Sequence, residues 1–256
     1  MTLEEHRALG VTVRGDWGHF RRLDTTSVKQ SYRVIPRTTV AGLLAGIVGS
    51  PRDSYYDVFT PDRSAIAVNV VNPVEVTRLS ELELTTNENS MKAISGAPIR
   101  RIIKRQTTAE ERQRNIYEWL KNPAYRIWVA LDDDEFYEDL RTHLENGTTV
   151  YTPTIGKSEC LATLDYHGEA KITATEAQKV DSVVPADDAD ITTAQNQISV
   201  ERIPAYNNAR DDGRGRELGG MTTVAYNADG KEVPVSNKEN VYSVGTGSLN
   251  ENVRFI

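Results

Sequence analysis

The sequence predicts an α+β protein of the ferredoxin-like, split βαβ type, with a long insertion before its last βαβ half. Two observations predict this class. Runs with strand-like and helix-like spacing of apolar residues follow one another as β-α-β-β and then, after a polar stretch, as β-α-β. The chain has 256 residues, long enough to bury about 70% of its unfolded surface in a core.

Apolar periodicity places a strand and then a helix in the first part of the chain. The run 9–13 alternates apolar and polar residues, as a half-buried strand does, and the glycine-containing run 15–18 ends it. Pro36 opens a helix, and Gly49 ends it. The apolar residues of this helix recur at helical spacing and form one stripe: Val40, Leu43, Leu44, Ile47 and Val48.

Two strand candidates and a possible helix follow. The runs 64–71 and 74–84 are rich in Val, Ile and Leu, which is typical of strands. The stretch 85–98 is polar and contains turn residues. The residues T-A-E-E at 108–111 form a capping-box pattern, which predicts a helix through Ile116, Tyr117 and Leu120.

The last βαβ half has clearer signals. The run 125–131 alternates and predicts a strand. The acidic run 132–135 begins a further helix, because carboxylates stabilise a helix N-terminus. The run 161–166 predicts the final strand. We therefore expect a ferredoxin-like domain over 1–169, and a small β-rich C-terminal subdomain over 170–256 that includes a glycine- and arginine-rich loop at 210–220.

Composition excludes several classes of protein. One cysteine rules out a disulfide framework and a multi-cysteine zinc site, and the four histidines are scattered. The longest apolar run, 40–48, is too short to cross a bilayer, and the polar N-terminus does not resemble a secretory signal. No common nucleotide, metal or hydrolase motif is present. We expect a cytoplasmic protein with no cofactor, no metal and no membrane contact.

Positive charge is concentrated in two segments of a chain whose net charge is −7. Residues 14–37 hold six basic side chains against two acidic ones, and residues 91–114 hold seven against two. Arginine outnumbers lysine 21 to 9, which suits phosphate recognition and base stacking, although codon bias or a high-salt habitat would give the same ratio. An acidic protein with such segments can bind a polyanion there.

Three short motifs carry the candidate contacts. His19 to Arg22 (H-F-R-R) combines arginines with rings that could stack on unpaired bases, or forms a solvated loop with Phe20 in the core. The run 99–105 (I-R-R-I-I-K-R) could hold a phosphate backbone, or form an amphipathic element whose basic side faces water. Gly156-Lys157-Ser158 offers backbone N–H groups and one cation. In a split βαβ domain the first and third motifs can lie close together.

These pieces together resemble a known family. The run G-D-W-G-H-F-R at 15–21 and the run S-Y-R-V-I-P-R-T-T-V-A-G-L-L-A-G-I-V-G at 31–49 are similar to the N-terminal signature of the CRISPR-associated protein five family, of the RAMP superfamily. The run P-T-I-G-K-S-E-C-L-A at 153–162 resembles its later glycine-containing segment. The match covers most of residues 9–166, and the last 90 residues carry little of it.

The resemblance implies a fold and a role. It implies a ferredoxin-like, RRM-related RAMP domain with a basic thumb insertion at about 85–115. The protein would hold the 5′ handle of CRISPR RNA in a type I Cascade effector complex, of subtype I-B from a salt-adapted archaeon. It would contact the backbone and large subunits, and target DNA through the complex. The expected RNA contacts are His19, Phe20, Arg21, Arg22, Lys29, Tyr32, Arg37, Arg100, Arg101, Lys104, Arg105, Gly156, Lys157 and Ser158.

Two alternatives remain at this stage. The resemblance implies a first alternative, because one branch of the family is a metal-independent endoribonuclease. Its characteristic residues are a Tyr, a Lys and a His, with the Lys and the His adjacent in the sequence. This chain has no Lys-His dipeptide, so we expect no catalytic residue, although His19 with Lys29 or Tyr32 stays open as an acid–base group. The other alternative is an RRM-like RNA-binding protein outside CRISPR.

Overall fold

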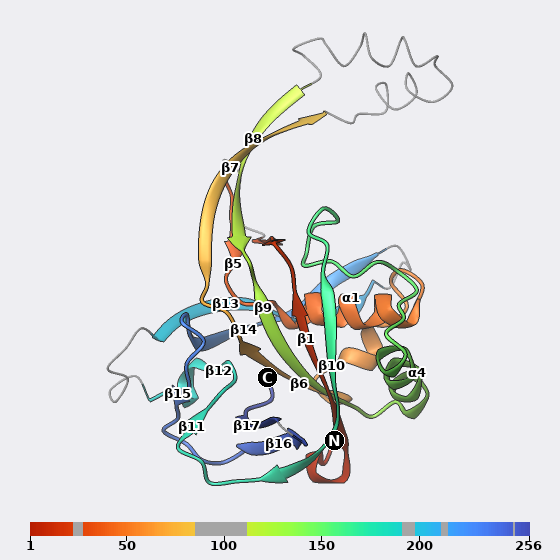
Figure 1. Cartoon of the computed structure of the whole chain (residues 1–256), viewed down its shortest axis with the longest axis vertical. Coiled ribbons are helices and arrows are strands. Elements are labelled where there is room, and N and C mark those ends of the chain that lie inside the picture. Colours follow the sequence, from red (N-terminus) through yellow and green to blue (C-terminus); the bar gives the residue numbers. More distant parts are fainter. Residues whose placement is uncertain (23–27, 85–111, 191–197, 211–214, 248) are drawn as a thin grey trace.

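A computed structural model describes residues 1–22, 28–84, 112–190, 198–210, 215–247 and 249–256. Its centre is a six-stranded antiparallel sheet with the strand order β17-β16-β10-β1-β9-β6 (Figure 1). These strands are β1 (Arg7–Arg14), β6 (Ser64–Val70), β9 (Ala124–Leu131), β10 (Thr163–Ala174), β16 (Tyr242–Thr246) and β17 (Leu249–Val253).

The α+β class is confirmed. Helices α1 (Arg37–Val48) and α4 (Asp134–Glu145) pack on one face of the sheet. The elements β1, α1, β6, β9, α4 and β10 occur where the sequence predicts them, whereas the strand predicted at 74–84 lies outside this sheet. Among these strands the sheet order is β10-β1-β9-β6, and the ferredoxin-like interpretation depends on this order.

Helix α1 begins and ends as predicted. Pro36 is its N-cap, and Gly49 ends it with a φ of +79°, in the left-handed region that favours glycine. Four of the five predicted stripe residues are buried, and the fifth, Val48, packs partly against the same core. The helix therefore rests on the sheet through its apolar stripe and leaves a face with Gly42 and Gly46 on its other side.

The sheet closes on itself through the segment 181–183. The Asp181 N–H donates to the Asn252 carbonyl of β17 at 2.7 Å, and the Val183 N–H donates to the Val68 carbonyl of β6 at 2.8 Å. At the C-terminus, the Ile256 N–H donates to the Ile66 carbonyl of β6 at 2.9 Å. These hydrogen bonds cover part of each outer edge of the six-stranded sheet, which limits where the strand of another chain could add.

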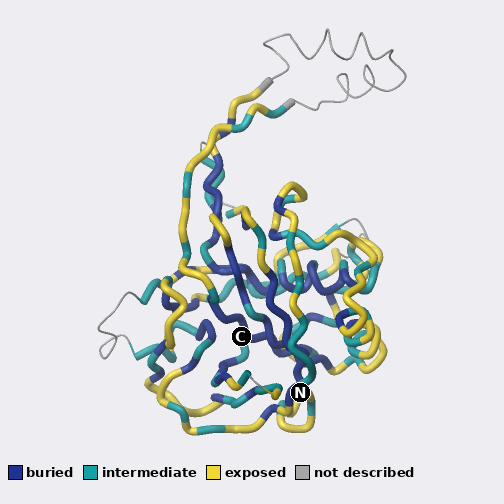
Figure 2. The backbone as a smooth tube through the Cα atoms, viewed as in Figure 1, coloured by how far each residue is buried: buried dark blue, intermediate teal, exposed yellow. Residues whose placement is uncertain are grey.

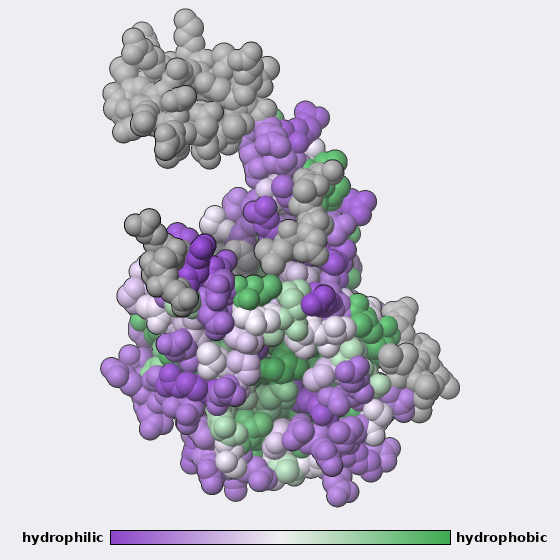
Figure 3. Space-filling view, turned by 180° about the vertical axis from the view of Figure 1, so that it is seen from behind, coloured by the Kyte–Doolittle hydropathy of each residue, from purple (hydrophilic) through white to green (hydrophobic). Residues whose placement is uncertain are grey.

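Strands β7 (Glu75–Leu84) and β8 (Arg112–Lys121) pair antiparallel and form an arm that extends away from the sheet (Figures 1 and 2). The helix predicted through residues 116–120 is therefore wrong. In β8 the side chains alternate with a period of two: Tyr117 and Trp119 lie on one face of the arm, and Ile116 and Glu118 on the other. Pairing with β7 outweighs the local capping-box pattern. The arm carries exposed apolar side chains among hydrophilic ones (Figure 3): Val76, Leu79, Leu82 and Ile116.

Short strands connect the sheet to the arm and to the C-terminal region. Near the arm lie β2 (Trp17–Gly18), β3 (Phe20–Arg21), β4 (Val28–Lys29) and β5 (Ser31–Tyr32). The C-terminal region holds β11 (Lys179–Val180), β12 (Val184–Pro185), β13 (Ile198–Ala209), β14 (Arg216–Asn227) and β15 (Val233–Pro234). Single-turn 3-10 helices cover Leu3–Glu5, Tyr56–Phe59 and Ala186–Asp188.

The C-terminal region is β-rich, as expected, and has a small core of its own. The expected boundary after residue 169 stays a prediction. It falls inside β10, and β16 and β17 extend the main sheet. The segment 216–220, expected as a loop, begins β14. Its glycines lie under the Tyr206 ring, which a Cβ on Gly219 would approach to 2.1 Å. No helix in the described ranges is long and apolar enough to cross a membrane.

Candidate RNA-binding groove

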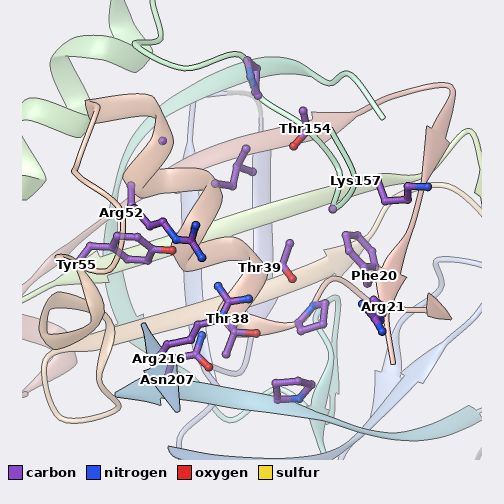
Figure 4. A pocket seen from close by; sticks show the side chains of 18 of the residues that line it. Phe20, Arg21, Thr38, Thr39, Arg52, Tyr55, Thr154, Lys157, Asn207 and Arg216 are labelled. Carbon is purple, nitrogen blue, oxygen red and sulfur yellow. The ribbon is translucent and has the colours of Figure 1, made fainter. Parts of the chain in front are cut away.

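A groove of about 900 Å³ lies between α1, the loop 151–157 and the β13–β14 hairpin (Figure 4). The N-terminal turns of α1 contribute Thr38 and Thr39, and its glycine face contributes Gly42 and Gly46. Five tyrosines line the groove as well: Tyr32, Tyr55, Tyr56, Tyr117 and Tyr151. The groove thus combines hydroxyl groups, aromatic rings and a floor of small residues.

The structure brings the first and third sequence motifs together. The His19 N–H donates to the Ile155 carbonyl at 3.1 Å. Gly156 has a φ of +89°, and a Cβ there would lie 1.9 Å from the His19 carbonyl oxygen. Arg21 and Lys157 line the groove at this junction (Figure 4). The expected proximity of the two loops is confirmed, and a close backbone approach that only glycine permits creates it.

Lys157 is held by the arm. Its Nζ lies 2.9 Å from a Glu81 carboxylate oxygen of β7 and 4.1 Å from the centre of the Tyr117 ring. Burial alone would lower the pKa of Lys157, but the hydrogen bond to Glu81 and the neighbouring carboxylates raise it overall. Lys157 is therefore charged at neutral pH, and Glu81 neutralises part of that charge.

His19 and Phe20 are buried, each with 2% of its surface exposed. The Nδ1 of His19 lies 2.8 Å from the Glu118 carbonyl oxygen, and its Nε2 has no partner among the described atoms. Burial lowers the pKa of His19, so its ring is neutral near pH 7. The Phe20 ring packs 5.8 Å from the Tyr125 ring in the core. The packing of Phe20 in the core agrees with the alternative that the sequence left open; Phe20 also borders the groove, and its stacking on a base stays a prediction.

Two other expected contacts also belong to the interior. Arg37 is 3% exposed, donates to the Ser64 carbonyl at 2.8 Å, and has its pKa lowered to about 10 by burial. Tyr32 is buried beneath the Arg22 guanidinium, which lies 5.5 Å from the centre of its ring. Arg37 is therefore corrected from a surface contact to a buried residue that fastens α1 to Ser64 of β6 through Nη2, while its Nε has no partner among the described atoms.

Of the remaining expected contacts, some lie in the described part of the chain and others do not. Arg21 is exposed, and Arg22 is half-buried with one nitrogen 3.6 Å from Glu201. Lys29 pairs in register with Tyr117 of β8, and the Ser158 hydroxyl donates to Glu159. The basic cluster Arg100, Arg101, Lys104 and Arg105 lies outside the described residues.

Sequence reasoning missed the other end of the groove. Arg52 and Tyr55 come from the turn after α1, Tyr151 from the loop before β10, and Asn207 and Arg216 from the β13–β14 hairpin (Figure 4). The sequence indicates this end only through the glycine- and arginine-rich composition of 210–220, which predicts a loop but no binding site. In the ranges that the structure describes, no group of three or more acidic, His or Cys side chains is placed to hold a metal ion.

Comparison with known proteins gives the family. A family model described as CRISPR-associated protein (Cas_Cas5) matches residues 8–229, and no curated protein matches the sequence. The chain is similar to a structure titled CRISPR RNA-guided surveillance complex, with a TM-score of 0.49 and 10% identity over 89% of this chain and 90% of that chain. It is also similar to a crystal structure of a CRISPR-associated protein, with a TM-score of 0.41 and 13% identity over 94% of this chain and 98% of that chain. Because the family model spans most of the sequence, the chain belongs to the CRISPR-associated protein (Cas_Cas5) family.

Proposed function

We propose that this protein is a non-catalytic, RNA-binding subunit of a type I CRISPR Cascade complex, and that the groove holds the 5′ handle of CRISPR RNA. The observation that supports it is the charge of the groove. In a chain of net charge −7, the described lining residues include four cations, Arg21, Arg52, Lys157 and Arg216, against one carboxylate, Asp53. Glu81 and Glu159, outside the lining, offset the charge of Lys157, so the excess comes mainly from the three arginines. A local excess of positive charge in an acidic protein marks where a polyanion binds.

The other lining groups fit a single strand of RNA. Guanidinium and ammonium groups contact phosphates, and threonine hydroxyls such as those of Thr38 and Thr39 can hydrogen-bond to phosphate or ribose oxygens. Tyr151 is 57% exposed and lines the groove, so it can offer a stacking face. Single-stranded RNA, with its bases unpaired, is the ligand that uses all of these groups.

The wider assembly is part of the same proposal. The β10-β1-β9-β6 core is the ferredoxin-like RAMP domain, and the β7–β8 arm is the base of the thumb. The subunit contacts the backbone and large subunits and meets target DNA through them. The exposed apolar side chains of the arm support protein contacts there, because such residues are unusual on a free polar hairpin.

The geometry disfavours a nuclease. His19, Tyr117 and Lys157 do meet, with the His19 and Tyr117 ring centres 5.2 Å apart. His19, however, is nearly fully buried, and a general base must come within hydrogen-bond reach of the 2′-hydroxyl. The Tyr117 hydroxyl donates to Glu83 at 2.5 Å, and burial together with this bond raises the pKa of Tyr117 to about 12. The cluster therefore packs the base of the arm.

The groove is tested by removing its cations at the junction. The double variant Arg21→Ala, Lys157→Ala is expected to weaken binding of the host's repeat-derived single-stranded RNA at least tenfold. The log–log salt slope should fall by about 0.7 for each lost phosphate contact. Fluorescence anisotropy across salt concentrations measures both quantities on the full chain.

A matched control removes two exposed charges outside the groove, Lys171→Ala with Arg202→Ala, and should leave affinity and slope near wild type. The melting temperature of each variant checks folding. If the groove variant, still folded, binds with an unchanged slope, the RNA does not occupy the groove and the proposal fails.

A separate experiment addresses catalysis. His19→Gln keeps a side-chain donor near the Glu118 carbonyl and removes the only imidazole in this region of the described structure. Cells carrying it should contain as much mature CRISPR RNA as wild-type cells, measured by northern blot. Loss of mature RNA with a folded, assembled protein would favour the nuclease instead.

A further inference from the structure

Two arginines from distant parts of the sequence point toward each other across the groove (Figure 4). Arg52 belongs to the turn after α1, and Arg216 is the first residue of β14 in the C-terminal hairpin. Both line the groove, and Figure 4 places them at the end away from Lys157. The last third of the chain thus contributes a cation to the same groove as the N-terminal motifs.

The two guanidinium groups share one environment. Burial raises the pKa of the Tyr55 hydroxyl, while Arg216 and Arg52 both act on it in the opposite direction, so both positive charges lie near this hydroxyl. Arg216 likewise lowers the pKa of the Tyr56 hydroxyl, against the raising effect of burial. The two groups therefore surround a pair of tyrosine hydroxyls from opposite walls of the groove.

This end of the groove has fewer carboxylates than guanidinium groups among its described lining residues. Asp53, the one carboxylate among the described lining residues, lies 3.4 Å from the Arg52 Nε and also accepts a hydrogen bond from the Tyr56 hydroxyl. The Arg52 side chain is 92% exposed. The guanidinium groups of Arg52 and Arg216 repel each other, and the single carboxylate of Asp53 cannot offset both charges. A bound anion would reduce this repulsion.

We propose that Arg52 and Arg216 form a second phosphate site in the groove, so that RNA is held at two points and the C-terminal hairpin takes part in binding. This rests on the proposed function. The floor between the two ends permits it: Gly42 and Gly46 add no side chain, and a Cβ at Gly42 would already lie 3.3 Å from the Tyr55 hydroxyl. A backbone passing over these glycines can reach both cationic ends. The phosphate is an internal phosphodiester or a 5′-terminal phosphate, which share the same chemistry.

The test uses the full chain, with a 3′-labelled single-stranded repeat RNA carrying either a 5′-hydroxyl or a 5′-phosphate. Arg52→Ala and Arg216→Ala should each weaken binding several-fold and reduce the log–log salt slope by about 0.7. Arg216→Lys should recover part of the slope, because it keeps the charge. Arg202→Ala, on the same hairpin but outside the groove lining, is the matched control and should leave the slope unchanged. Equal losses with both RNAs identify an internal phosphodiester, and losses confined to the 5′-phosphorylated RNA identify the terminal phosphate.

The outcomes separate this site from the proposed function. If Arg21→Ala, Lys157→Ala weakens binding while Arg52→Ala, Arg216→Ala leaves affinity and slope unchanged, RNA binds at one end of the groove and the second site is wrong. If the wild-type chain and its reconstituted complex bind neither RNA, the proposed function itself fails. The site would also be wrong if Arg202→Ala reduced the salt slope of RNA binding as much as Arg216→Ala does. A charge outside the groove would then affect RNA binding as strongly as a charge inside it.

Discussion

Gly156→Ala is expected to destabilise the protein by roughly 3 kcal/mol, because a left-handed backbone and a direct clash coincide at this residue. The φ of Gly156 is +89°, and the new Cβ would lie 1.9 Å from the His19 carbonyl oxygen. Backbone atoms cannot swing aside as a flexible side chain can. The loop 155–160 must therefore separate from the strand that carries Arg21, and the junction end of the groove should be lost. Urea unfolding followed by circular dichroism measures the change.

Gly147→Ala isolates the conformational part of this cost. Gly147 has a similar φ of +62°, but nothing lies within 4 Å of the position of its Cβ. A left-handed alanine without a clash should cost about 1 kcal/mol. Equal destabilisation by the two variants would mean that the close approach at His19 has no energetic consequence, and the described junction would be wrong.

Leu44→Ala is expected to lower the free energy of unfolding by about 2–5 kcal/mol, the usual range for a leucine that leaves a cavity in a packed core. Leu44 is fully buried in the stripe of α1 that packs on the sheet. Val48→Ala, one turn further along and half-buried, removes less buried surface and should cost clearly less. A Leu44 variant with an unchanged unfolding midpoint would show that this stripe is not core. Because α1 is also the floor of the groove, RNA affinity should fall along with stability.

Elements defined by local periodicity could be predicted from the sequence. Helix α1 has an apolar stripe, a proline at its start and a glycine after its end, and the structure places it within one residue of the expected start. Strand β9 was recognised because its alternation is regular over 125–131. In both elements the residues that determine the conformation are adjacent in the chain, so no tertiary information was needed.

Strand β8 was misread because its conformation depends on a partner strand. The capping-box pattern at 108–111 is local, whereas pairing with β7 joins residues on either side of a long insertion. Tyr117 and Trp119 fit both a helix and a strand by type. Their alternation becomes decisive only when the pairing with β7 is known.

The groove was predicted at one end and missed at the other. The proximity of His19 and Lys157 could be predicted from the sequence, because the topology of a split βαβ domain places their two loops close together. Nothing in a βαβ pattern connects Arg52 with Arg216, since the β13–β14 hairpin lies outside that pattern. Sequence also could not tell that Phe20 and Arg37 face inward, because motif composition does not reveal which side of a strand or helix is covered.

The hydrogen bonds that close the sheet at 181–183 have a consequence for cutting the chain into fragments. A fragment that stops near residue 169 would lose the residues that hydrogen-bond to the outer edge of β6. It would also lack the last residues of β10, so two strand edges would be left without partners. Bare edges of this kind recruit other chains by backbone pairing, so such a fragment would be aggregation-prone during expression. The part of the chain after residue 169 is therefore needed to cover the edges of the sheet that the earlier residues form.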